Sequence, residues 1–598
     1  MARKSIGKSF IANVLIIVLI VGSFSSINLN EKTTDSQLLE DDFEDLPKMF
    51  SQRNSNDWST SASASNPAVL NSIDSSPNNE LVVAGIISGS TTMSMGSASI
   101  TSGQYIEPWI AKSDVNGNWQ WIEQVSITGV SQYAEATISD IAVASNGDIF
   151  ATGMFYDTIS FGPITLTSTG YWDCWTAKIN TNGQWQWAQS LNGDGDYDGV
   201  TVNTLDVVYG TSITTDSNND PIIGGWFLGN TDVGVAADTG AQNGDDIEIF
   251  VAKYSNSGNL QWYDVARGQG AQEVNSMVVD SSNSIWISTN FEVSMTFGSV
   301  VANAGINEIP VGIAKISQAG SWQSAYATTG SGSATVTDFS IDGQNNLLMS
   351  GVYSGSINLG SSLTSAGQND AFAASMSSTG SWNWAKSVGG TSFDSGSGIE
   401  YDPNTGYTIL GLSSQSSFSF SSQTFNTRGY NDSVIVTFGP NGNPVALFDA
   451  GSSADDAVSG IALLGNGALA IGGNYNGTID FGTSTAQSQT TSVLMPYVWL
   501  TETIAVLDAD GDGVADEDDN CPNTANPGQE NTDLDSEGDA CDSDDDNDGI
   551  TDNFPDNCPR NSQTGWTSTR DFNDPPSSTD WDNDGCKDDH PEDNDDDN

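Results

Sequence analysis

The chain has 598 residues, of which 77 are Asp or Glu and 16 are Lys or Arg, so its formal net charge at pH 7 is -61. A charge of this size repels nucleic acid and anionic membranes, and we expect neither as a partner. The one histidine, His590, lies in an acidic terminal stretch. This excludes a histidine-activated nucleophile and a multi-histidine zinc site from the main part of the chain.

The amino terminus has the order of charged and apolar residues that is typical of a secretory signal. Basic residues precede an apolar run from Phe10 to Gly22, and small residues follow it. The run is shorter than the roughly 20 residues that a bilayer span needs, so the sequence predicts a signal peptide over 1–26 and no membrane insertion beyond it. A short uncleaved anchor is the alternative. Both place the rest of the chain outside the cytosol, beginning with an acidic linker over 27–56.

The main part of the chain is built from a repeated pattern. In four copies an apolar segment ends in Ala-Lys, in six copies a glycine turn follows the segment, and in three of these two alternating tryptophans come next. In the second copy, Trp175–Lys178 is followed by Gly183 and by Trp185 and Trp187. The turn glycines recur about every 60 to 75 residues: Gly117, Gly183, Gly258, Gly320, Gly380 and Gly442. A polar turn followed by an apolar strand, usually containing glycine, lies upstream of each copy, and together the two patterns mark seven units.

Each unit has the pattern of four antiparallel strands. In the second unit we expect strands over 138–144, 149–155, 174–179 and 184–190, joined in part by Asn-Gly turns, which are strong hairpin signals. Four-stranded units at this spacing predict an all-β fold, a seven-bladed β-propeller over 57–505. A β-solenoid or a row of sandwich domains is the rival, although solenoid coils are usually shorter and sandwiches need more strands per unit.

The last unit lacks a strand that the amino-terminal segment can supply. The seventh copy, Tyr497–Leu500, is not followed by a turn and a tryptophan pair, whereas Trp58–Ala62 resembles the start of the missing strand. We therefore expect the N-terminal strand to complete the last blade, which leaves no unpaired edge. With this pattern, residues 57–505 resemble the bacterial and archaeal family called seven-bladed β-propeller repeats.

The recurrent tryptophans are expected to pack between blades: Trp119, Trp121, Trp185, Trp187, Trp382 and Trp384. A sugar-stacking platform is the alternative for these positions. The one cysteine of this part, Cys174, is interpreted as a small apolar residue, because no charged surroundings that would activate a thiol are evident.

The composition changes abruptly at Asp508, since from there to Asn598 there are 31 acidic and 3 basic residues. Within this tail, aspartates alternate before a glycine three times. Alternate residues of a tight loop can point at one centre, and Ca2+ takes six to eight such oxygen ligands, whereas magnesium keeps more water. An unstructured acidic tail is the alternative, and we expect that state without calcium. The predicted Ca2+ ligands are Asp508, Asp510, Asp512, Asp516, Asp533, Asp535, Asp542, Asp544, Asp546, Asp548, Asp552, Asp580, Asp582, Asp584 and Asp588.

The other four cysteines, Cys521, Cys541, Cys558 and Cys586, all lie in the tail. Export permits disulfides, and three pairings are possible. Pairing of neighbours, Cys521 with Cys541 and Cys558 with Cys586, is favoured because each bond then closes a short loop. A zinc site is the rival, but the oxygen-rich surroundings and the lack of a Cys-x-x-Cys motif argue against it.

The segments Asp508–Pro522 and Asp544–Pro559 both end in Asp-Asn-Cys-Pro, and they resemble thrombospondin type 3 repeats. The resemblance implies that residues 506–598 wrap a string of calcium ions with almost no secondary structure, stapled by sequential disulfides. It weakens beyond residue 559, because Trp566–Asp580 departs from the pattern. We expect the ending to be a truncated further loop.

These features predict a secreted or cell-surface, non-enzymatic calcium-binding protein. Its propeller would be an adhesion or recognition module for an extracellular glycan or protein. A secreted polysaccharide hydrolase or lyase with a propeller active site is one alternative; Asp245, Asp246 and Glu248 are available for it, although no pattern singles them out. A structural surface-layer component is the other alternative.

Overall fold

The computed structural model describes residues 58–64, 67–169, 171–193, 207–228, 231–232, 237–238, 247–268, 270–303, 310–421, 423–476, 478–480, 485–487, 495–501, 519–521, 523–533 and 536–545. The chain divides into two compact units, Met1–Gly442 with Ala446–Ile504, and Asn443–Val445 with Ala505–Asn598. The predicted signal peptide and linker lie outside the described residues. Within the described ranges the chain forms strands, turns and bends but no helix, and hence no helix that could cross a membrane.

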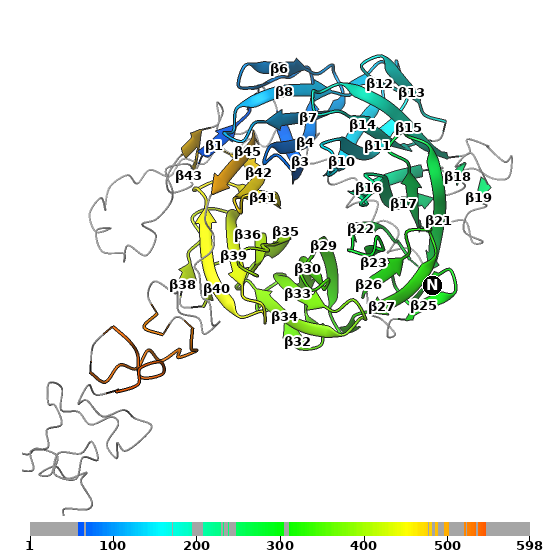
Figure 1. Cartoon of the computed structure of the whole chain (residues 1–598). Coiled ribbons are helices and arrows are strands. Elements are labelled where there is room, and N and C mark those ends of the chain that lie inside the picture. Colours follow the sequence, from blue (N-terminus) through cyan, green and yellow to red (C-terminus); the bar gives the residue numbers. More distant parts are fainter. Residues whose placement is uncertain are drawn as a thin grey trace, which may run out of the picture. The chain divides into compact units, whose positions relative to one another are not determined.

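In the described part of the first compact unit, which contains the repeats, seven antiparallel sheets of four or six strands follow one another. They are called sheets 1 to 7 here (Figure 1). Sheet 1 contains β3 (Ala68–Ser75), β4 (Leu81–Ser88), β7 (Ile106–Ser113) and β8 (Trp119–Gln124). Sheet 2 contains β10 (Glu135–Val143), β11 (Ile149–Tyr156), β14 (Asp173–Ile179) and β15 (Trp185–Gly193). Sheet 3 contains β16 (Val207–Thr215), β17 (Pro221–Leu228), β20 (Glu248–Tyr254) and β21 (Leu260–Gly268). Sheet 4 contains β22 (Val274–Val279), β23 (Ile285–Asn290), β26 (Val311–Ile316) and β27 (Trp322–Ala327). Sheet 5 contains β29 (Ser333–Ile341), β30 (Leu347–Ser354), β33 (Asp370–Met376) and β34 (Trp382–Val388). Sheet 6 contains β35 (Asp394–Tyr401), β36 (Thr408–Ser414), β39 (Asp432–Phe438) and β40 (Pro444–Ala450). Sheet 7 contains β41 (Asp456–Leu463), β42 (Leu469–Tyr475), β45 (Met495–Thr501) and β1 (Trp58–Ser61).

Short hairpins between the second and third strands of the units were not expected from the sequence. Two of them extend the preceding sheet: β18 (Thr231–Asp232) with β19 (Ala237–Asp238) on sheet 2, and β24 (Ser294–Phe297) with β25 (Val300–Asn303) on sheet 3. Three others pair with a short strand that follows the outer strand of the preceding unit. The hairpin of β5 (Thr92–Met95) and β6 (Ala98–Thr101) pairs with β2 (Ser63–Ala64), and that of β12 (Thr158–Phe161) and β13 (Ile164–Thr167) pairs with β9 (Ser126–Ile127). The hairpin of β31 (Ser356–Asn358) and β32 (Ser362–Thr364) pairs with β28 (Thr329–Gly330). The remaining hairpins are β37 (Phe418–Phe420) with β38 (Gln423–Phe425) and β43 (Thr478–Asp480) with β44 (Thr485–Gln487). The first five hairpins therefore tie neighbouring units together by backbone hydrogen bonds.

Sheet 2 shows why these residues form strands. The four predicted strands are present, with ends shifted by up to three residues. The turns that join them place Gly147 at φ 83° and Gly183 at φ 77°, a conformation in which other residues are strained. The tight turns keep consecutive strands antiparallel and adjacent.

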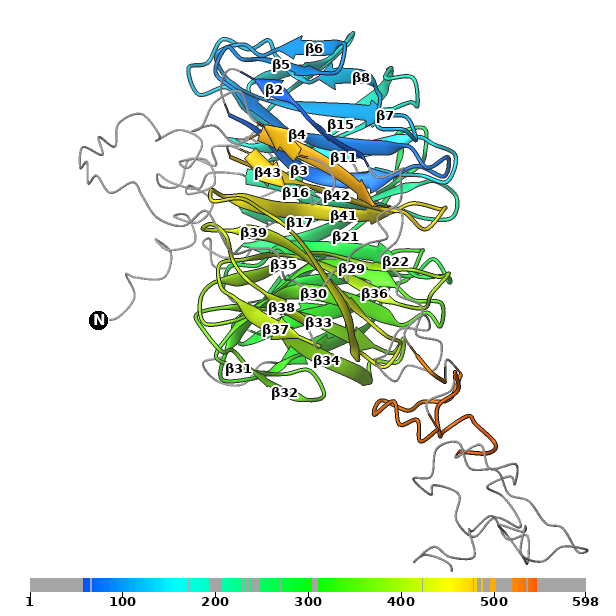
Figure 2. The same cartoon turned by 90° about the vertical axis from the view of Figure 1, so that its left-hand side faces the viewer.

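The first strand of every unit lies at the inner edge of its sheet, around a common centre (Figures 1 and 2). Each of these inner strands contacts the inner strand of the next unit, and β3 contacts both β10 and β41. The pairing of each inner strand with the second strand has an irregularity, such as the one between Ile138 and Asp140 in β10. No single sheet closes on itself; the arrangement is a succession of separate sheets.

The N-terminal strand pairs with the last unit. Residue Trp58 lies opposite Leu500, and Ser61 lies opposite Tyr497, so β1 is the outermost strand of sheet 7. At the inner edge, Oγ of Ser459 in β41 donates to the carbonyl oxygen of Leu70 in β3 at 2.8 Å. Sheets 7 and 1 are thus joined by hydrogen bonds between the two ends of the repeat region.

The second aromatic residue of most repeat pairs packs on the following sheet. The ring of Trp121 lies against Gly183, and its Nε1 donates to the carbonyl oxygen of Thr181 at 3.1 Å. The same contact recurs in Trp187 with Gly258, Trp262 with Gly320, Tyr326 with Gly380, and Trp384 with Gly442. The expectation of packing between units is confirmed for Trp121, Trp187 and Trp384.

The first tryptophan of each pair lies against the outer hairpin of its own unit, and it also packs in an apolar cluster shared with the preceding sheet, which confirms the expectation for Trp119, Trp185 and Trp382 as well. Trp119 lies near Gly96, Trp185 near Gly162 and Trp382 near Gly360. The hairpins, which sequence patterns did not reveal, provide the surface that these rings cover.

The lysine of the Ala-Lys motif anchors the turn between the first two strands of its own unit. Lys253 Nζ lies 2.7 Å from Asp216 Oδ2, and their side chains are 3% and 1% exposed. The pairs Lys112–Glu80, Lys178–Asp148 and Lys315–Asp280 have the same 2.7 Å separation. The motif therefore has a structural role at one end of the sheets.

Candidate functional site

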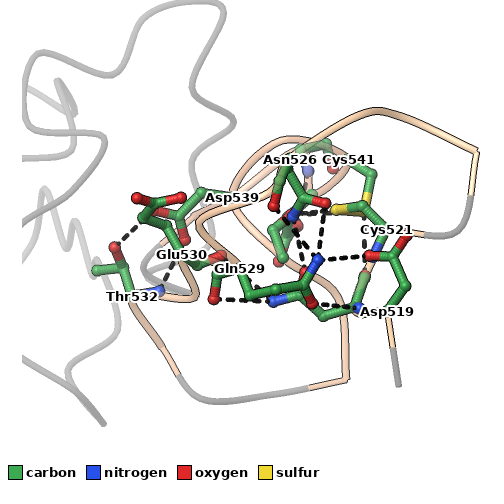
Figure 3. Close-up of a disulfide and its surroundings, with 12 residues drawn as sticks. Asp519, Cys521, Asn526, Gln529, Glu530, Thr532, Asp539 and Cys541 are labelled. Carbon is green, nitrogen blue, oxygen red and sulfur yellow. Dashed lines mark hydrogen bonds between the residues drawn. A yellow bond between two sulfur atoms is a disulfide. The ribbon is translucent and has the colours of Figure 1, made fainter. Parts of the chain in front are cut away.

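The described part of the tail is held by a disulfide. Cys521 and Cys541 are bonded, their Cα atoms are 5.6 Å apart, and they are separated by 20 positions in the sequence (Figure 3). The predicted pairing of these two residues is confirmed. Cys558 and Cys586 lie outside the described residues, and their pairing stays a prediction.

Polar side chains organise the loop that this disulfide closes (Figure 3). Oδ1 of Asp519 accepts hydrogen bonds from the backbone N–H of Cys521 and from Nε2 of Gln529, each at 2.7 Å. Asn526 Nδ2 donates to Oδ1 of Asn520, also at 2.7 Å. Amide and carboxylate groups thus order a segment in which no strand or helix is described.

Three of the predicted calcium ligands lie within the described residues, namely Asp533, Asp542 and Asp544. Oδ1 of Asp542 accepts the backbone N–H of Asp544 at 3.0 Å. In the described stretches of the chain, no group of three or more His, Cys, Asp or Glu side chains could hold a metal ion. The other predicted ligands lie outside the described residues: Asp508, Asp510, Asp512, Asp516, Asp535, Asp546, Asp548, Asp552, Asp580, Asp582, Asp584 and Asp588.

Two aspartates that the alternating pattern did not single out are buried in the tail. Asp519 is 8% exposed and Asp545 is 4% exposed. A carboxylate is stable away from water only where hydrogen bonds or a cation meet its charge. Asp545 lies between Asp544 and Asp546, both predicted ligands. Oxygen-only donors and buried carboxylates on either side of the disulfide-closed loop fit calcium, which would neutralise the mutual repulsion of the acidic residues.

A second group of carboxylates lies on the inner strands of the sheets. Asp140 in β10 and Asp338 in β29 directly follow the pairing irregularity of their strands. In β3 and β35 the residue that directly follows the irregularity is not acidic, and Asp74 and Glu400 lie two residues after it. Because side chains alternate along a strand, these positions lie on the same face of their sheets.

These inner carboxylates bond to the following sheet. The bonds run from the backbone N–H of Val143 to Asp74 Oδ2 at 2.7 Å, from that of Ile213 to Asp140 Oδ2 at 2.9 Å, and from that of Ile399 to Asp338 Oδ2 at 2.9 Å. Each acid therefore links two neighbouring inner strands. Sequence reasoning missed this group, because the pairing irregularity that aligns these positions is visible only in the structure.

Burial raises the pKa of all four inner acids. It brings the pKa of Asp74 and Asp338 to about 7 and that of Glu400 to about 8, and it also raises the pKa of Asp140. Neighbouring carboxylates add to the rise: Asp140 acts on Asp74 and Asp338, while Asp338 and Asp74 act on Glu400. Protonation of Asp74, Asp338 and Glu400 is thus favoured near neutral pH.

Of the residues considered for nucleophilic or polysaccharide chemistry, Glu248 and Cys174 lie within the described ranges, and both are buried. Glu248 is 3% exposed and accepts the backbone N–H of Gly268 at 3.3 Å, so it holds the end of β21. Asp245 and Asp246 lie outside the described residues. Cys174 is fully buried, and burial raises the pKa of its thiol to about 12, in line with its interpretation as an apolar residue.

The tail matches the family model described as Thrombospondin type 3 repeat, over residues 507–529 and 530–565. This confirms the resemblance for that region, and such repeats bind calcium and are typical of extracellular proteins. No curated protein matches the chain. The resemblance of residues 57–505 to seven-bladed repeats continues to rest on the sequence pattern.

Solved structures similar to the chain have low identities. The quinohemoprotein alcohol dehydrogenase from Comamonas testosteroni is 9% identical with a TM-score of 0.33, and the match covers 75% of this chain and 77% of that one. A PL25 polysaccharide lyase, an ulvan lyase bound to a sulfated glycan, is 10% identical with a TM-score of 0.36, over 69% and 92%. The Hadza microbial sialidase Hz136 is 8% identical with a TM-score of 0.32, over 74% and 94%.

The expectation that the chain is not an enzyme is corrected by these matches. These three similar structures are a dehydrogenase, a lyase and a sialidase. At this identity and TM-score they assign no reaction to the chain. The prediction relied on the lack of a catalytic motif in the sequence, and such a lack does not exclude an activity whose residues come from separate repeats.

Proposed function

We propose that this chain is an extracellular calcium-binding protein that recognises a glycan or protein ligand, with an adhesive role at the cell surface. A seven-bladed β-propeller over 57–505 would present the loops that contact the ligand. Residues 506–598 would be a calcium-wrapped tail that connects this module to its surroundings. A signal peptide over 1–26 and an acidic linker over 27–56 would precede both.

The match of residues 507–565 to thrombospondin type 3 repeats carries the calcium part of the proposal. It is supported by the disulfide between Cys521 and Cys541 and by the burial of Asp519 and Asp545. Calcium would stabilise this segment by offsetting carboxylate repulsion, because the tail has few apolar residues with which to form a core.

The propeller part is supported by the succession of sheets 1 to 7 around one centre. Inner strands of successive sheets are in contact, β3 contacts β41, and β1 is added to sheet 7. Seven blades joined in this way would leave the ends of the sheets free for loops that bind ligands.

Calcium titration of the full chain by calorimetry tests the proposal. We expect heat of binding together with slower proteolysis of the tail, and we expect EDTA to reverse both effects. Asp510→Ala and Asp546→Ala should each lower the number of ions bound. Asp114→Asn, which changes a turn acid between β7 and β8, is the matched control and should bind as the parent does. Absence of heat and equal cleavage with calcium and with EDTA would refute the calcium assignment.

A further inference from the structure

Acidic and aromatic side chains gather where the inner strands β10, β16 and β22 begin. Glu135 is the first residue of β10, Glu273 directly precedes β22, and Tyr209 lies on β16 between these two strands (Figure 1). The pKa of Tyr209 is raised by burial first and then by the carboxylates of Glu273 and Glu135. The two glutamates therefore act on one phenol from neighbouring sheets.

Aromatic rings continue outward from Glu135. Glu135 lies opposite Tyr156 of the paired strand β11, and the ring centroid of Tyr156 lies 5.4 Å from that of Tyr171. Tyr171 in turn packs edge-on against Trp172 at 4.8 Å. Tyr171 is 38% exposed and Tyr133, two residues before Glu135, is 65% exposed. Exposed tyrosines beside a partly buried acid offer flat surfaces to a ligand.

Polar atoms in this region lack hydrogen-bond partners. Trp226 is 6% exposed, its ring packs edge-on against Tyr209 at 5.7 Å, and its Nε1 donates no hydrogen bond. Oε1 of Glu135 is also buried without a partner. Buried polar atoms in proteins are normally paired, and both atoms lie beneath the surface, so a bound molecule reaches them only if neighbouring side chains shift. Burial raises the pKa of both Glu135 and Glu273.

The charge around these residues selects among ligands. At the ends of the sheets opposite to these residues, ion pairs join turn acids to the motif lysines, namely Lys112, Lys178, Lys253 and Lys315. Carboxylates and aromatic faces both attract ammonium groups. They disfavour uronic acids and sulfated sugars, which would bring further negative charge to the glutamates.

We propose that Glu135, Tyr209 and Glu273, with Tyr171 and Tyr133 at the rim, form a binding site for a sugar chain that carries protonated amines. The ammonium groups meet the glutamates, and the sugar rings lie on the exposed tyrosines. This assignment deepens the proposed recognition of a glycan and is independent of calcium binding by the tail.

Calorimetric titration of the calcium-loaded full chain with a glucosamine hexamer tests the site, in about 0.15 M salt to screen attraction to the acidic tail. N-acetylglucosamine and galacturonic acid hexamers are the comparison ligands. We expect one saturable site for glucosamine, binding at least about tenfold weaker for the acetylated hexamer, and none for the uronate. Glu135→Gln with Glu273→Gln should lower glucosamine affinity by at least about tenfold, and Tyr171→Ala, a surface change, should weaken it without affecting the fold.

The control Asp114→Asn changes an acid at the opposite ends of the sheets and should bind like the parent. Equal affinity of the parent and the Glu135→Gln, Glu273→Gln variant would place the binding on the acidic tail and overturn the proposal. So would equal affinity for the glucosamine and galacturonic acid hexamers, or no binding of any hexamer. Calcium titration of the same variants separates this result from a failure of the calcium assignment.

Discussion

Replacing Gly183 by alanine should destabilise the repeat region more than the same change at Gly147. Both glycines lie in turns of sheet 2, with φ of 77° and 83°, so both changes carry the left-handed backbone cost of about 1–2 kcal/mol. A Cβ at Gly183 would lie 2.9 Å from the Trp121 ring, whereas a Cβ at Gly147 has no neighbour within 4 Å. Overpacking adds about 1–3 kcal/mol, so we expect a loss of about 2–5 kcal/mol for Gly183→Ala and about 1–2 kcal/mol for Gly147→Ala.

Urea unfolding followed by tryptophan fluorescence measures the two losses, provided that the slope with denaturant is unchanged. A double-mutant cycle with Trp121→Ala isolates the contact, because the extra cost of Gly183→Ala should vanish once the indole is removed. Equal destabilisation by Gly183→Ala and Gly147→Ala in the parent background would show that the tryptophan does not constrain the turn. The contact between neighbouring sheets would then lack the role that its geometry implies.

The inner acids give a pH prediction. The pKa of Asp338 is raised to about 7, so the folded state binds the proton more tightly than the unfolded state. The contribution of Asp338 to the free energy of unfolding should fall as pH rises from about 4 to about 7. Asp338→Asn should flatten this decline in thermal unfolding scans, and an unchanged dependence of stability on pH would refute the prediction. Lys253→Met leaves Asp216 buried without its 2.7 Å partner, so the free energy of unfolding measured with urea should fall by about 3–5 kcal/mol. Adding Asp216→Asn should restore much of this loss, and no recovery would contradict the ion-pair explanation. Cys521→Ser should speed proteolysis between residues 519 and 545 even with calcium, whereas Cys174→Ala should not; equal rates would mean that the disulfide does not order the tail.

Sequence periodicity predicted the local elements well because strand alternation and glycine turns are local properties. The four strands of sheet 2 and the Cys521–Cys541 bond followed from spacing alone. The outer hairpins were missed because their segments are short and vary between units. The contact of the first tryptophans, such as Trp119, with these hairpins was therefore not foreseen.

The candidate ligand site was not predictable in the same way. Glu135, Tyr209 and Glu273 come from three successive units, and none of them belongs to the repeated motif. Only the side-by-side placement of β10, β16 and β22 brings their charges together. A pattern search favours residues that recur, whereas this group consists of residues that differ between repeats.

By itself the sequence determined the all-β character, the repeated four-stranded units and the oxygen-rich calcium pattern of the tail, because these depend on residue spacing over a few positions. The tertiary structure decided which side chains from different units meet: the tryptophan that covers a neighbouring turn, the acids that join inner strands, and the glutamates around Tyr209. Those contacts depend on how the sheets pack. Burial then raises the pKa of these carboxyl groups.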